Sequence, residues 1–186
     1  MVFSIIFHPT KTFETALEVA NVSKALIIVL LSGLFFGLAA FFLTAQLVPA
    51  IYLFIFAIVQ WLVYSAIVWF FEFVHVRKRK KMVGTSFTQC ACVVGELWKI
   101  NLISSILAAF VAFIFPFSSD ALLLVVGSIF MIIIVILVIA WIVASFKMLK
   151  VLVGVHKWKL VINWAIINLL NLMIIGFISS LVNLLI

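Results

Sequence analysis

Five long apolar stretches dominate this sequence, and short polar or charged segments separate them. They cover about residues 25–46, 49–73, 88–115, 121–146 and 160–186. A helix of about 20 apolar residues crosses the ~30 Å hydrocarbon core of a bilayer. Because 69% of the residues are hydrophobic and only 9% are charged, the chain lacks the polar surface that a soluble domain needs. We therefore predict an all-α, polytopic membrane bundle of five transmembrane helices, forming a single domain over residues 1–186.

The basic residues predict the orientation of this bundle. They gather in the segment before the first stretch and in the segments after the second and the fourth, whereas the other two turns carry none. The basic residues of the two later segments are Arg77, Lys78, Arg79, Lys80, Lys81, Lys147, Lys150, Lys157 and Lys159. Short loops that are rich in Lys and Arg stay in the cytoplasm. We therefore expect a cytoplasmic N-terminus, cytoplasmic basic loops and a C-terminus on the outside.

Residues 1–24 precede the first stretch and show a helical pattern of their own. Pro9 is suited to the start of a helix, and Phe13, Ala16, Leu17 and Ala20 then recur at helical spacing. This pattern predicts a short amphipathic helix on the membrane surface. A simple tether to the first span is the alternative, and the sequence leaves both open.

Small and polar residues inside the apolar stretches predict helix packing. Gly33 and Gly37 form a GxxxG pattern, which lets another helix approach closely, and we interpret it as packing without requiring a dimer. Polar residues fall mostly on one side of the third and fifth stretches, and such groups usually face the bundle interior. The candidates for that interior are Asn101, Ser104, Asn163, Asn168 and Asn171.

Two charged residues lie near the interior of the third stretch. Glu96 and Lys99 are spaced for an ion pair on a helix, and a charge at membrane depth indicates function by default. The alternative, which Trp98 between them favours, places both at the cytoplasmic boundary, with the Lys99 side chain extending to water. The sequence also leaves open whether residues 82–95 begin this helix or lie at the interface.

The sequence predicts neither catalysis nor a cofactor. It contains no Gly-x-Ser-x-Gly pattern, no phosphate-binding glycine loop and no paired His and Asp. Residues that bind transition metals share the predicted inner side, but none has a recognised ligand spacing. They are His8, His75, His156, Cys90, Cys92, Glu72 and Glu96. We therefore expect no enzyme and no metal site.

Three short segments stand out by their order and spacing: the Pro-Thr-Lys-Thr-Phe start at Pro9–Phe13, the Gly-Thr-Ser-Phe start of the third helix at Gly84–Phe87, and the lead into the fifth at Gly154–Lys159. In these segments the chain resembles the YIP domain family of Ypt/Rab-GTPase-interacting membrane proteins. The resemblance covers nearly the whole chain and implies membrane trafficking, small-GTPase recruitment or membrane shaping. The long cytosolic N-terminal region and Asp-Leu-Tyr-Gly-Pro motif of eukaryotic members are missing, as in a minimal, prokaryotic-style form.

These observations lead us to expect a non-enzymatic membrane scaffold or adaptor, whose cytoplasmic basic loops engage acidic lipid headgroups or a cytosolic protein. Homo-oligomers are compatible with this expectation, and nucleic acid is not an expected partner. A small transporter or channel component with a polar bundle interior is the alternative. A membrane enzyme that acts on lipid is a third interpretation, which no residue pattern demands.

Overall fold

The computed structural model describes residues 4–78, 85–117, 120–153 and 157–185, and these are all-helical apart from short connections. Five helices are long and apolar enough to cross a membrane, as predicted. They are α3 (Val22–Thr44), α4 (Leu47–Lys78), α5 (Phe87–Ile114), α6 (Asp120–Val153) and α7 (Lys157–Leu185). Two short helices, α1 (Ser4–Phe7) and α2 (Pro9–Glu18), precede them, and a 3₁₀ turn at Phe115–Phe117 follows α5.

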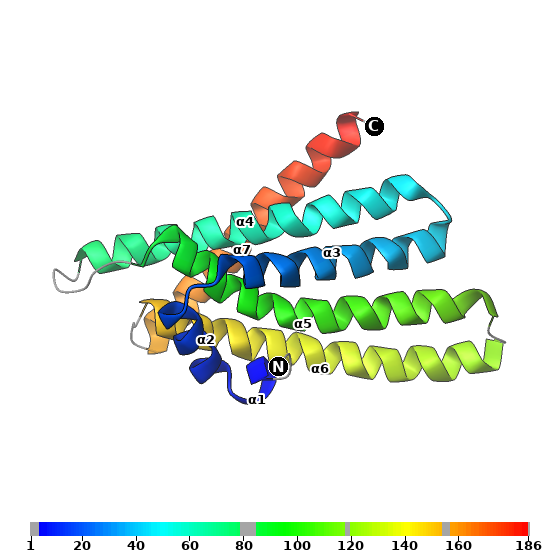
Figure 1. Cartoon of the computed structure of the whole chain (residues 1–186), viewed down its shortest axis with the longest axis horizontal. Coiled ribbons are helices and arrows are strands. Elements are labelled where there is room, and N and C mark those ends of the chain that lie inside the picture. The colour runs from blue at the N-terminus through cyan, green and yellow to red at the C-terminus, as the bar shows by residue number, and fades with distance from the viewer. Residues whose placement is uncertain (1–3, 79–84, 118–119, 154–156, 186) are drawn as a thin grey trace.

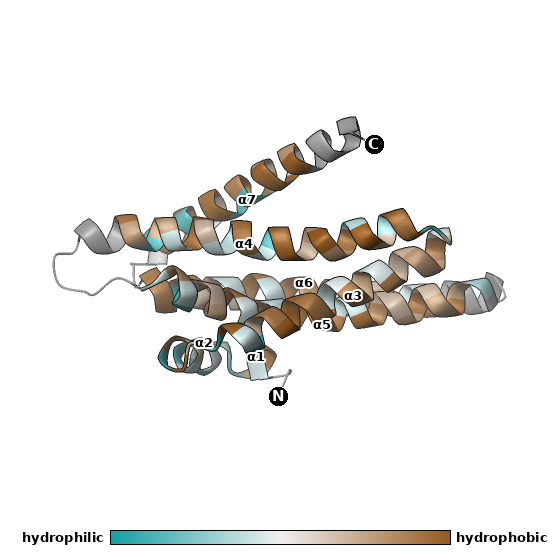
Figure 2. Cartoon of the chain, turned by 45° about the horizontal axis from the view of Figure 1, so that its top comes forward, coloured by the Kyte–Doolittle hydropathy of each residue, from teal (hydrophilic) through white to brown (hydrophobic). Residues whose placement is uncertain are grey.

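The helices α3 to α6 run side by side, whereas α7 leans away from them toward the C-terminus (Figures 1 and 2). The short helices α1 and α2 fold back beneath one end of the bundle and contact α5 and α6. The start of α5, the end of α4 and the end of α6 all lie toward that same end (Figure 1). Brown, hydrophobic ribbon covers most of the five long helices (Figure 2).

Side-chain caps explain where two of the long helices begin. The Asn21 side chain accepts a hydrogen bond from the Lys24 backbone N–H at 2.9 Å, and α3 starts after it. Ser86 and Gln89 form a reciprocal capping box at the start of α5. The segment whose character the sequence left open is therefore helix from Phe87 onward, and it is buried from Cys90. Residues 82–84 lie outside the described residues.

Glycines bring three helices into close contact. A Cβ atom on Gly33 would lie 2.9 Å from the backbone oxygen of Phe54, and one on Gly37 would lie 2.7 Å from that of Ala50. Both neighbours belong to α4, so the GxxxG pair packs within the chain, as the packing interpretation requires. A Cβ on Gly95 of α5 would lie 2.9 Å from the Cα atom of Ala25 in α3.

The predicted N-terminal segment packs on the bundle. Ile5 and Phe13 are fully buried in the main hydrophobic cluster, whereas Lys11, Glu14 and Glu18 point to the outside. Pro9 occupies the first position of α2, where its missing N–H costs no hydrogen bond. The contact of this helix with a membrane surface stays a prediction.

Candidate functional site

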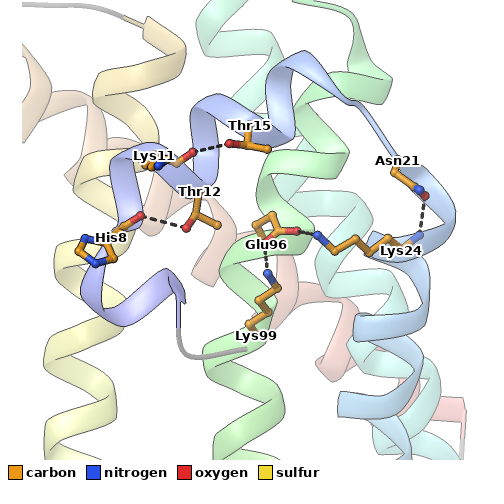
Figure 3. A network of polar contacts seen from close by, with 8 residues as sticks. All are labelled: His8, Lys11, Thr12, Thr15, Asn21, Lys24, Glu96 and Lys99. Carbon is orange, nitrogen blue, oxygen red and sulfur yellow. Dashed lines mark hydrogen bonds and ion pairs between the residues drawn. The ribbon is translucent and has the colours of Figure 1, made fainter. Parts of the chain in front are cut away.

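A buried carboxylate with two lysines marks the end of the bundle where α1 and α2 lie. The Nζ atom of Lys24 lies 2.8 Å from Oε1 of Glu96, and the Nζ atom of Lys99 pairs with Oε2 (Figure 3). Glu96 and Lys99 are 5% and 4% exposed, so the pair is nearly withdrawn from solvent. The Lys99 ammonium therefore pairs with Glu96 inside the bundle, whereas the boundary alternative expected its side chain to extend to water. The position of the two residues relative to the membrane boundary stays a prediction.

A pocket opens beside this cluster, which we call the charged pocket. It has a volume of about 570 Å³ and lies between α1–α2, the start of α3 and one face of α5. Figure 3 shows α2 passing above Glu96 in the view, with the hydroxyls of Thr12 and Thr15 donating to the backbone oxygens of His8 and Lys11. The lining residues that bear charge or titrate are His8, Lys11, Lys24, Cys92, Glu96 and Lys99.

The charged pocket has an excess of positive charge. Three lysines and a single carboxylate line it, since Glu14 and Glu18 of α2 are not among its lining residues. Glu96 holds the ammonium groups of Lys24 and Lys99 close together, where repulsion would otherwise separate them. Lysine donors around a confined space bind phosphate as point charges, so the arrangement suits an anion.

The other predicted basic residues are not among the residues that line the charged pocket. Lys147, Lys150 and Lys159 are exposed. Lys78 and Lys157 mark the end of α4 and the start of α7. Of the run that begins with Arg77, the residues Arg79, Lys80 and Lys81 lie outside the described residues.

A second pocket lies within the spans, and we call it the interior pocket. It has a volume of about 270 Å³, and its polar lining residues are Gln60, Tyr64, Asn101, Ser104 and Asn171. Its apolar walls are Trp98, Ile100, Leu137, Val138 and Trp141. Three of the predicted interior residues, on α5 and α7, therefore meet at one site. No Asp, Glu, Lys, Arg or His is among its lining residues.

The other two predicted amides lie outside that lining. Asn163 is 8% exposed, and Asn168 is half-buried and donates from its side-chain nitrogen to the Trp164 carbonyl oxygen at 2.8 Å. The indole N–H of Trp164 in turn donates to the Ser145 hydroxyl at 2.7 Å. These contacts hold α7 to itself and to α6, which makes Asn168 a structural residue of the helix pair.

The sequence reasoning missed two of the pocket's polar residues, and it considered Glu72 only as a metal ligand and not for its structural contact. Gln60 and Tyr64 are one helical turn apart on α4, and this i,i+4 spacing inside an apolar stretch was the available signal. Glu72, which is 2% exposed, accepts a hydrogen bond from the Thr85 backbone N–H at 3.1 Å. That bond ties the segment before α5 to α4, and no local pattern indicates it.

The part of the chain that the structure describes contains no group of three His, Cys, Asp or Glu side chains placed to hold a metal ion. Cys90 and Cys92 are buried free thiols. The side chain of His75, and His156 altogether, lie outside the described part.

No family model, curated protein or solved structure matches this chain. The resemblance to the YIP domain family therefore stays a prediction.

Proposed function

We propose that this chain is a non-enzymatic membrane scaffold that gathers acidic lipids at its basic end. The observation that supports this most directly is the charged pocket, in which Lys24 and Lys99 pair with a single carboxylate and the exposed Lys11 also lines the wall. Each lysine near an anionic membrane surface contributes about 1 kcal/mol of attraction. A cluster held in place by Glu96 keeps this attraction at a defined position on the bundle.

The position and lining of the charged pocket suit a lipid phosphate. The pocket lies beside the first turn of α3, where a span begins and where headgroups meet the protein. Lys24 is 58% exposed along its side chain, so its ammonium can turn toward an incoming phosphate while Lys99 keeps the Glu96 pair. Ala16, Val19 and Ala25 add apolar lining, against which the glycerol and first acyl carbons can pack.

Exposed lysines outside the pocket have a more general role in this proposal. Lys147, Lys150 and Lys159 attract an anionic leaflet without fixing the place of any single lipid. The predicted topology, with these residues in the cytoplasm, would direct the attraction to the cytoplasmic leaflet.

Lipid retention by the full chain tests the proposal. The protein is reconstituted into nanodiscs of phosphatidylcholine with phosphatidylglycerol, and the phosphatidylglycerol retained after release is counted by native mass spectrometry. Removing two lysines from the pocket, in a Lys11→Gln/Lys24→Gln variant, should lower retention roughly thirtyfold, at about 1 kcal/mol for each charge.

A variant with the same loss of charge outside the pocket is the control. Lys147→Gln/Lys150→Gln should lower retention much less, because these exposed residues do not line the pocket. Equal loss in both variants would mean that only total charge matters, and unchanged retention in the pocket variant would remove the proposed site.

A second candidate function, a small transporter or channel component, draws support from the interior pocket. Polar side chains of α4, α5 and α7 meet there inside the spans. Proteoliposomes that leak a small solute, and that become tight in an Asn101→Leu variant, would favour this function. Vesicles that stay tight under several ion and solute gradients would count against it.

A further inference from the structure

Two polar atoms in the interior pocket have no hydrogen-bond partner among the described residues. They are the hydroxyl of Tyr64, which is fully buried, and the side-chain oxygen of Asn171, which is 8% exposed. The Asn168 side-chain nitrogen, which donates one N–H to the Trp164 carbonyl oxygen, has a second N–H that faces the Tyr64 oxygen, and this contact still leaves the proton of the Tyr64 hydroxyl without an acceptor. A buried polar group without a partner destabilises the fold, so folded proteins keep few of them.

The depth of the interior pocket excludes most polar ligands. Gln60 and Asn101 lie midway along the spans Leu47–Val74 and Phe87–Ile114. On α5, Asn101 and Ser104 follow Lys99, so this pocket lies deeper in the bundle than the charged pocket. Since no charged residue lines it, an ionised headgroup would lose its hydration there without gaining a counter-charge. The ligand chemistry that fits is uncharged.

The two unpartnered atoms specify what an uncharged ligand must carry. The Asn171 oxygen accepts a hydrogen bond, so the ligand must offer a donor, and the Tyr64 hydroxyl can donate, so the ligand must also offer an acceptor. A hydroxyl group beside an ester carbonyl satisfies both atoms. Asn101, Ser104 and Gln60 add further polar lining at the same level.

The walls of the pocket favour a ligand with an apolar remainder. Trp98, Leu137 and Trp141 give it an aromatic and aliphatic lining. Val138, also in the lining, is 52% exposed, which places one edge of the pocket at the lipid-facing surface of α6. The α7 helix, which carries Asn171, packs against α4 and α6 and leans away from the other long helices toward the C-terminus (Figures 1 and 2).

We propose that the interior pocket binds the hydroxyl-and-ester end of an uncharged acylglycerol, such as a diacylglycerol, with its acyl chains in the surrounding lipid. The hydroxyl donates to the Asn171 oxygen, and an ester carbonyl accepts from the Tyr64 hydroxyl. This site is independent of acidic-lipid binding at the charged pocket, because the two pockets share no lining residue.

Photolabelling of the reconstituted full chain tests this site. Phosphatidylcholine nanodiscs contain either a photoactivatable diacylglycerol or a phosphatidylcholine with the same photoactivatable chain, and labelled peptides are mapped by mass spectrometry. The diacylglycerol probe should label the pocket-lining segments of α4 to α7 at least about fivefold more than the phosphatidylcholine probe. Unlabelled diacylglycerol should compete with it.

Two conservative variants and one control complete the test. Tyr64→Phe and Asn171→Leu each remove an unpartnered polar atom, so they should lower labelling about fivefold or more without loss of thermal stability. Tyr52→Phe, on the same helix but outside the pocket lining, should change nothing. If either variant fails to fold, competition by unlabelled diacylglycerol for labelling of the unmodified chain tests the site.

Equal labelling by the two probes, or labelling that survives both variants in folded protein, would overturn the assignment. A pocket that holds only water would be labelled by neither probe above background, and that result would overturn it as well. Retention of phosphatidylglycerol at the charged pocket is measured separately, so failure here leaves that proposal standing.

Discussion

Lys24, in the first turn of α3, reaches across to Glu96 of α5, and its Nζ atom lies 2.8 Å from Oε1. One helix turn along α5, Lys99 pairs with the other oxygen of the same carboxylate. Gly95, next to Glu96, packs against Ala25, next to Lys24. The ion pair therefore forms where α3 and α5 come closest, and the small residues beside it allow the approach.

Removal of the Glu96 charge should destabilise the bundle. A Glu96→Gln variant leaves the Lys99 ammonium, which is 4% exposed, buried beside a neutral amide. Breaking a buried ion pair on one side costs about 3–5 kcal/mol. Thermal unfolding in detergent should show a clear loss relative to the unmodified chain.

Two further variants distinguish the contribution of Lys99, the buried partner of Glu96, to stability from that of Lys24, the exposed partner. Glu96→Gln/Lys99→Met removes both buried charges and should recover most of the lost stability, because buried pairs are often replaceable by neutral residues. Lys24→Gln should cost less than about 1 kcal/mol, since its side chain is 58% exposed and solvent screens the interaction. A double variant no more stable than Glu96→Gln would contradict this account.

The glycines of α3 should tolerate no side chain. Gly37→Ala places a methyl group only 2.7 Å from the Ala50 backbone oxygen, so α3 and α4 must separate. Overpacking of this kind costs about 1–3 kcal/mol. Thermal unfolding or resistance to denaturing detergent measures the loss.

A glycine with open space around it serves as the control. A Cβ on Gly127 would meet nothing within 4 Å, so Gly127→Ala should be neutral or slightly stabilising, as alanine favours helix. Equal destabilisation by the two substitutions would argue against close packing of α3 and α4 as the cause.

The length and polarity of the helices are largely visible in the sequence, and their contacts are not. The five apolar stretches predict the five long helices, and the spacing of Asn101 and Ser104 indicates the inward side of α5. No local pattern could place Tyr64 beside them, because the register between α4 and α5 depends on tertiary packing. The indole N–H of Trp61, which donates to the Ala91 carbonyl oxygen at 3.1 Å, is one contact that sets this register.

The sequence also does not reveal which lysines line the charged pocket. Sequence alone draws attention to the run of basic residues after α4, whereas the structure gathers Lys11, Lys24 and Lys99 from three separate helices. These lysines stand 13 and 75 positions apart in the chain, so only the packing of α2 and α3 on α5 brings them to one pocket.

Loss of the capping box should loosen the start of α5. In a Ser86→Ala variant the Gln89 backbone N–H loses its acceptor, at 3.2 Å in the native protein, and a cap of this kind contributes about 1 kcal/mol. Hydrogen exchange of the amides in the first turn of α5 should accelerate. Ser180→Ala is the control, because Ser180 only donates back to its own helix and is exposed. Protection in the first turn that stays unchanged would contradict the role of the cap.

The N-terminal helices should detach from the bundle when Phe13 is shortened. Phe13 is fully buried in the main hydrophobic cluster, so Phe13→Ala removes a large apolar contact that is worth about 3–5 kcal/mol in a packed core. Because α2 covers one side of the charged pocket, its release should raise both proteolysis of the N-terminal segment and hydrogen exchange of Lys99 and its neighbours. Phe7→Ala is the matched control, since Phe7 is 73% exposed. Equal protease sensitivity of the two variants would show that Phe13 does not hold α2 on the bundle. A selective increase for Phe13→Ala would show that the pocket depends on a hydrophobic anchor contributed by the first helices.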